Sequence, residues 1–195
     1  MGYKTLQQNG SFRITDAPET IGAITQPATG AILAKREQFG AFTKLVLTLD
    51  NIPQAVVNGT EYQSTKIYTF PEGRILVLGV TATLRQKTTS VLASTLNASS
   101  TGAIALGTAA ASNVSLTSTM VDLLPSTAFT SSATINVAGT AVKAALAASA
   151  QFDGTTTAKP VFLNTAYATT TDVDADATQT ISGTVNICWV FLGDY

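Results

Sequence analysis

The sequence predicts an all-β fold: a jelly-roll-like antiparallel β-sandwich with an extended N-terminal arm and at most one or two short helices. Three observations favour this fold class. Several segments alternate apolar and polar residues with a period of two, which is typical of half-buried strands. Short strand-like segments are separated by Gly, Asn and Pro turns. Small residues dominate: Thr, Ala, Ser and Gly make 90 of the 195 residues, and charged residues make only 12%, against about 25% in a typical soluble domain.

The domain organisation is predicted to be one arm and one body. Residues 1–40 are expected to form the extended arm, and residues 41–195 the β-sandwich. Pro18 and Pro27 interrupt the apolar runs of the arm, and proline lacks the N–H that a central strand or a helix interior needs. The arm still holds more isoleucine and leucine than a disordered tail usually does, so it is predicted to dock on another surface.

The first clear strand covers residues 43–50, "TKLVLTLD". Its leucines alternate with Lys, Val and Thr, which predicts one buried and one exposed face. Asn58-Gly59 follows as a strong turn signal. These features predict a strand that ends in a tight connection.

The next strand, residues 75–84, follows the Pro71-Glu72-Gly73 turn. Both faces of its first half are apolar, so we predict a central strand covered on two sides. Gly79 inside the strand indicates a bulge or a close approach by another chain.

Residues 91–150 hold only two charged residues and consist of short strand-like pieces between turns. Such spacing is typical of a sandwich or jelly roll. The Ala-rich stretch 141–152 is predicted to form one short helix, and residues 120–124 a helical turn ended before Pro125.

The final strand, 181–192, has alternating apolar residues on one face and is apolar on both faces in its second half. It is therefore predicted to be an interior strand. Cys188 lies within it and is expected to be a small core residue. The core residues expected from all three strands are Leu45, Leu47, Ile75, Val77, Leu78, Val185, Ile187, Trp189 and Phe191.

The residue types present argue against most enzyme classes, so we expect the chain not to be an enzyme and to need no cofactor. Histidine is absent and Cys188 is the only cysteine, which excludes Ser-His-Asp and Cys-His arrangements and Cys-rich or His-containing zinc sites. A carboxylate hydrolase stays formally possible. The apolar runs are far shorter than the ~18 residues needed to cross a bilayer.

One acidic cluster is a weak candidate for a calcium site. Asp172, Asp174 and Asp176 alternate and could converge on one Ca²⁺, which prefers oxygen ligands. The spacing fails the EF-hand pattern, because Ala177 and Gly183 stand where that loop needs Gly and Glu. The favoured alternative is a solvated acidic loop that protects a strand edge.

Charge is divided unevenly along the chain. Residues 1–90 carry a net charge of +3 and residues 91–195 a net charge of −4. We hypothesise that the basic half, through Lys35, Arg36 and Lys44, faces a negatively charged partner surface. An ordinary solvated mixture of charges is the alternative. The net charge of −1 for the whole chain gives no indication of a nucleic-acid partner.

Two stretches carry a family resemblance: "IYTFPEGRILVLGVTATL" (67–84) and "ISGTVNICWVFLGDY" (181–195). Together with the low-charge Ala/Ser/Thr/Gly segment between them, they resemble the head decoration, or minor capsid, proteins of tailed bacteriophages. The likeness covers about residues 61–195 and contains no chemical site. It implies a jelly-roll-like sandwich, usually trimeric, mounted on the outside of a virion capsid.

The resemblance implies a structural role as capsid cement. The expected partners are the major capsid protein and further copies of the chain in a homotrimer, with no nucleic acid and no membrane. The arm could add a strand to a neighbouring sheet. The alternative is a receptor-binding or fibre-associated β module that recognises a host-surface glycan, although aromatic residues are only 7% of the chain.

Overall fold

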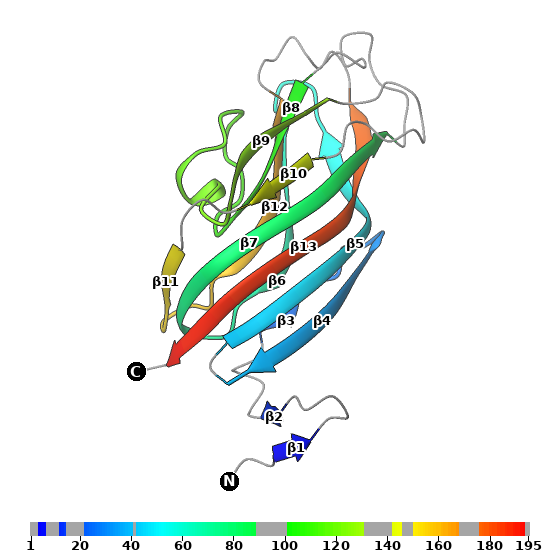
Figure 1. Cartoon of the computed structure of the whole chain (residues 1–195). Coiled ribbons are helices and arrows are strands. Elements are labelled where there is room, and N and C mark those ends of the chain that lie inside the picture. Colours follow the sequence, from blue (N-terminus) through cyan, green and yellow to red (C-terminus); the bar gives the residue numbers. More distant parts are fainter. Residues whose placement is uncertain are drawn as a thin grey trace.

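The computed structural model is an all-β sandwich of two antiparallel sheets, which confirms the predicted fold class (Figure 1). The structure describes residues 4–6, 12–14, 22–40, 42–88, 101–130, 142–145, 150–167 and 176–193.

The first sheet contains six strands, all paired antiparallel. They are β4 (Ala31–Phe39), β5 (Phe42–Val56), β7 (Gly73–Thr88), β10 (Val142–Ala145), β11 (Ala150–Gly154) and β13 (Ala177–Gly193). Their order is β10-β7-β13-β5-β4, and β11 pairs with β7 beyond this path. In Figure 1, β7, β13, β5 and β4 lie in front as long ribbons side by side.

The second sheet has five strands and lies behind the first (Figure 1). They are β3 (Ala23–Ile24), β6 (Tyr62–Thr69), β8 (Thr101–Gly107), β9 (Leu124–Thr130) and β12 (Pro160–Tyr167), in the order β3-β6-β12-β8-β9. Two short strands, β1 (Lys4–Leu6) and β2 (Phe12–Ile14), pair with each other as a separate sheet.

The stretch expected to be an arm contributes two strands to the sandwich. β4 pairs with β5 along its whole length, and its Ile32 is buried in the core. Gln26 fixes the connection between β3 and β4, because its side chain accepts a hydrogen bond from the Ile32 N–H and donates one to the Ile32 carbonyl. Residues 22–39 therefore belong to the body, and the boundary expected at residue 40 falls inside a β-hairpin.

The core lies between the two sheets and follows the alternation of the strands. The leucines of 45–49 face inward, as the period of two predicts. Trp189 is the largest fully buried side chain. Its ring packs edge-on against Phe70, at 5.4 Å between centroids, and at 6.0 Å from Tyr68. Burial raises the pKa of the Tyr68 hydroxyl above its usual value. The aromatic cluster thus joins the central strand of the first sheet to the second sheet.

The predicted bulge at Gly79 is present, and Leu78, which was predicted to lie in the core, is exposed beside it. Cys188 of β13 stands opposite Gly79, but the next residue, Trp189, stands opposite Val77, so Leu78 has no partner in the register. The extra residue shifts the alternation beyond the bulge, so Val77 and Val80 both face inward, and Leu78 is 42% exposed. The prediction that Leu78 lies in the core was wrong, because it assumed that both faces of this strand are covered, and the outer face is open at Leu78.

β13 is an interior strand, as predicted, and pairs with β5 on one side and β7 on the other. Val185, Ile187 and Trp189 point into the core, and Phe191 is partly buried against it. Gly183 has a φ of 141°, and a Cβ there would collide with the backbone carbonyl of Thr83. Only glycine fits this close approach of β13 to β7.

Both predicted helices differ from the structure. Within residues 141–152, β10 and β11 pair with β7 as strands, so the Ala-rich stretch is not one helix. Pairing with β7 outweighs the high helix propensity of alanine, because tertiary contacts override intrinsic propensity. The helical turn expected at 120–124 lies earlier, as a 3-10 turn over Ser118–Met120, and β9 already begins at Leu124.

The loop between β8 and β9 covers part of the outer face of the second sheet. Leu116 and Met120 pack there in a small apolar cluster with Ala105 and Ala166. The fully buried side chain of Asn164 fastens the loop, donating to the Ala109 and Met120 carbonyls.

Polar side chains bond the two sheets together inside the sandwich. Gln54 of β5 donates to the Thr65 hydroxyl at 2.7 Å and accepts from the Thr165 hydroxyl at 3.0 Å. Gln179 of β13 donates to the Tyr167 hydroxyl. Each contact joins the first sheet to the second. Part of the interior is therefore polar and held by matched donors and acceptors.

Candidate interaction surface

The outer face of the first sheet carries a row of four apolar side chains that crosses four strands. The pairing places Phe39 of β4 opposite Phe42 of β5, Phe42 opposite Val190 of β13, and Val190 opposite Leu76 of β7. Phe39 and Phe42 are 52% and 50% exposed, whereas Val190 and Leu76 are half-buried. We call these four residues the apolar row.

Further apolar side chains lie beside the row. Leu78 is exposed at the β7 bulge, Leu192 is 37% exposed, and Cys188 is half-buried on the outer face. The expectation that Cys188 is a core residue was wrong: its inward-facing neighbours are Ile187 and Trp189. Exposed apolar side chains gathered at one end of a sheet are typical of a contact surface, whereas scattered ones are not.

A lysine pair forms one margin of the apolar row. Lys35 and Lys44 both bind Glu37, with Nζ–O distances of 2.9 and 3.9 Å. The hydrogen bond and charge of Lys35, together with the charge of Lys44, hold the pKa of the Glu37 carboxyl below its usual value. Since Glu37 stays ionised, two positive charges share one negative charge, and the margin keeps a surplus of positive charge.

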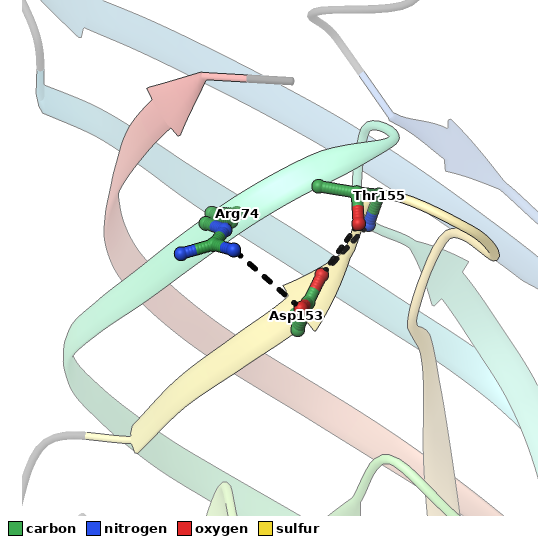
Figure 2. A network of polar contacts seen from close by, with 3 residues as sticks. All are labelled: Arg74, Asp153 and Thr155. Carbon is green, nitrogen blue, oxygen red and sulfur yellow. Dashed lines mark hydrogen bonds and ion pairs between the residues drawn. The ribbon is translucent and has the colours of Figure 1, made fainter. Parts of the chain in front are cut away.

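A second charged contact lies on the other side of the row, because Arg74 precedes Leu76 by two residues on β7. Arg74 lies 3.9 Å from a carboxylate oxygen of Asp153 on β11 (Figure 2). Asp153 also accepts hydrogen bonds from the backbone N–H and the hydroxyl of Thr155. These bonds, and then the charge of Arg74, lower the pKa of Asp153. This contact pairs one positive charge with one negative charge, so it leaves no surplus of positive charge on this side of the row.

The two outer faces of the sandwich therefore differ. The loop between β8 and β9 packs apolar side chains against the second sheet. The apolar row on the first sheet keeps about half of each phenylalanine exposed to solvent. In Figure 1 no labelled strand lies in front of β7, β13, β5 and β4. The first sheet is thus the face that offers apolar area to a partner.

The structure separates the three basic residues proposed for partner contact. Lys35 and Lys44 lie together on the outer face around Glu37. Arg36 lies on the opposite face of β4, because successive side chains alternate, and its charge acts on Tyr68. The prediction that Arg36 shares one surface with the lysines was wrong for this reason.

The acidic cluster proposed for calcium is described in part. Asp172 and Asp174 lie outside the described residues. Asp176 accepts a hydrogen bond from the backbone N–H of Asn58 at 3.0 Å, so it holds the 57–60 turn. Within the described ranges, no three Cys, Asp or Glu side chains gather as a metal site would require. In the same ranges no helix is long and apolar enough to span a bilayer.

The sequence reasoning missed the two phenylalanines that dominate the surface. Phe39 and Phe42 flank residues 40–41, and Gly40 has a φ of 61°. A two-residue loop that begins with glycine, between two strand-like runs, is a hairpin signal, and a tight hairpin places the flanking residues opposite each other on one face. Placing the arm boundary at residue 40 hid this pattern.

A scan against protein-family models found no match for the chain, and a search of curated proteins found no significant match.

Proposed function

We propose that the chain is a structural virion protein that decorates and stabilises a bacteriophage capsid. In this proposal it binds the outer surface of the major capsid protein shell and associates as a trimer. The observation that carries the proposal is the open face of the first sheet, where the apolar row adjoins the lysine pair. A surface of this kind suits attachment to another protein and requires no reaction.

The resemblance to decoration proteins supports the same proposal. The two resembling stretches, 67–84 and 181–195, contain most of β7 and most of β13. These strands pair with each other in the first sheet, and both contribute to the apolar row. The resemblance therefore concerns one connected part of the fold, which supplies Leu76 and Val190 to the apolar row, while the two phenylalanines and the lysine pair lie on β4 and β5 outside it.

The glycan-binding alternative has weaker support. A sugar-binding surface would be expected to expose tryptophan or tyrosine, because these rings combine an apolar face with a hydrogen-bonding group. Trp189 is only 1% exposed, and Tyr68 and Tyr167 are buried. Phe39 and Phe42 are exposed but carry no polar group that could bind a hydroxyl.

The proposal is tested with expanded shells of the cognate major capsid protein that lack the decoration protein. The purified chain is mixed with these shells, unbound protein is removed by sedimentation, and the pellet is imaged by cryo-electron microscopy. We expect ordered extra density on the outside of the shell and a higher temperature of shell disruption. Shells that leave the chain in the supernatant at micromolar concentration would contradict the proposal.

A further inference from the structure

The chemistry of the apolar row and its margin specifies the surface that the face would contact. Two phenylalanines expose about half of their side chains, and Leu78 and Leu192 extend the same apolar area. Beside them, Lys35 and Lys44 share a single carboxylate, Glu37. The surface is therefore apolar in the middle and positively charged at the β4 edge.

We infer that this end of the first sheet is the footprint on a foreign protein whose surface has an apolar centre and carboxylates at its border. The inference rests on the proposed function, in which that protein is the capsid shell. Phe39 and Phe42 enter the apolar centre, and the lysine pair meets the acidic border. Interfaces have this anatomy, with aromatic residues in the middle and charged residues at the rim.

The size of the face suits a protein partner. Four strands spaced about 4.8 Å apart span roughly 14 Å, and the end of the face from the lysine pair to the apolar row, about five residues at about 3.3 Å, spans roughly 16 Å. Side-chain relief makes the accessible area larger than this projection. A standard protein interface buries about 800 Å² on each side, so this end supplies the centre of one such contact and the surrounding surface supplies the rest.

A second copy of the chain fits the same face less well. A symmetric contact would place the lysine pair of one copy near the lysine pair of the other, or leave both pairs without a partner. Like charges that face each other are unfavourable. The edge strand β4 also disfavours contact with a second copy, because the positive charges of its central residues Lys35 and Arg36 oppose pairing with another β4. The surplus of positive charge points to an acidic partner.

The test uses the same shells and compares matched variants of the full chain. Phe39→Thr/Phe42→Thr removes the two rings and keeps β propensity; its control is Leu33→Thr, which removes a 68% exposed leucine at the other end of β4. Lys35→Glu/Lys44→Glu reverses the charged margin; its control is Lys66→Glu, an exposed lysine on β6 of the second sheet. Thermal unfolding verifies that each variant folds.

We expect the double phenylalanine variant to bind shells about 30-fold more weakly, because two half-exposed rings lose their burial on binding. The double lysine variant should bind at least about tenfold more weakly and lose most of the salt dependence that wild type shows between about 50 and 300 mM. Both controls should remain within about twofold of wild type.

The outcomes separate this inference from the proposed function. If wild type binds shells and both double variants bind equally well, the footprint is wrong and the proposed function stands. If light scattering shows that Phe39→Thr/Phe42→Thr only disperses an oligomer while shell binding persists, the row is a self-interface and the inference is overturned. If wild type does not bind shells at all, the proposed function fails and the footprint fails with it.

Discussion

Replacing Asn164 by alanine should release the loop that covers the second sheet. The amide of Asn164 donates to the carbonyls of Ala109 and Met120 at 2.9 and 2.8 Å. Its oxygen accepts from the Ser64 hydroxyl at 2.6 Å and from the Ala111 N–H at 3.1 Å. One side chain that is fully buried therefore makes four hydrogen bonds.

The expected loss of stability in Asn164→Ala depends on which polar groups lose their hydrogen-bond partner. Without the amide, the Ser64 hydroxyl still accepts from the Ala111 N–H at 2.6 Å, so those two groups remain paired. The carbonyls of Ala109 and Met120 lose the Asn164 donor. An unsatisfied buried polar group costs about 1–3 kcal/mol. We expect Asn164→Ala to lower the free energy of unfolding by about 2–4 kcal/mol, because water can reach the part-buried Ala109 carbonyl.

Urea unfolding followed by fluorescence measures this loss, since Trp189 is the only tryptophan and lies in the core. The matched control is Asn186→Ala, which removes a half-buried asparagine on the outer face whose amide donates one exposed 3.3 Å hydrogen bond to the Thr81 hydroxyl. The control should change stability by less than about 0.5 kcal/mol. Hydrogen exchange should accelerate in residues 108–123 of the Asn164 variant. Equal stability of the two variants would refute the proposed role of Asn164.

Three further predictions concern single residues. Gly183→Ala should lower the free energy of unfolding, measured in urea, by more than about 2 kcal/mol, because φ is 141° and the new Cβ meets the Thr83 carbonyl. The control is Gly59→Ala, which should have a milder effect because nothing lies within 4 Å of its Cβ. Trp189→Ala should lower the free energy of unfolding by about 3–5 kcal/mol. Trp189→Phe should lower it clearly less, because the buried indole N–H has no hydrogen-bond partner to lose. Equal losses of stability in the two variants would contradict this. Burial raises the pKa of Asp122 above its usual 3.8, so the folded state binds the proton more tightly than the unfolded state. The contribution of this carboxyl to the free energy of unfolding therefore falls as pH rises from about 4 through the raised pKa. Asp122→Asn should therefore gain stability relative to wild type as pH rises over that window in parallel denaturation series, and a constant difference would argue against the raised pKa.

Much of the fold could be predicted because alternation is a local property. The leucines of 45–49 and the inward residues of β13 could be assigned to the core from a period of two alone. Gly79 marked the bulge, but the apolar residues on both faces of the strand also predicted cover on both sides, so Leu78 was assigned to the core although it is exposed. Gln54 and Gln179 face inward, although a polar residue interrupts the apolar alternation that predicts an inward position. Their hydrogen-bond partners come from the other sheet, so the sequence could not show that they are paired.

The candidate surface was less predictable because it depends on pairing between distant segments. The apolar row joins Phe39, Phe42, Leu76 and Val190, and no local pattern shows that these residues share one line across the sheet. The lysines could be recognised as basic, yet only the strand alternation of β4 separates Lys35 from Arg36. The Ala-rich stretch 141–152 illustrates the same limit, since its strands form against β7 and not from local propensity.

The central position of β13 has a consequence for how quickly the chain folds. Val56 pairs with Ala177 and Phe42 with Val190, which are 121 and 148 positions apart in the chain. Contacts this distant must overcome a large loop-closure entropy before they stabilise anything, and β proteins dominated by them fold in milliseconds to seconds. Until β13 inserts, β5 and β7 each present a long unpaired edge to other molecules. High yields of native protein should therefore require low temperature and low chain concentration, and exchange of β13 between copies is the misassembly to look for.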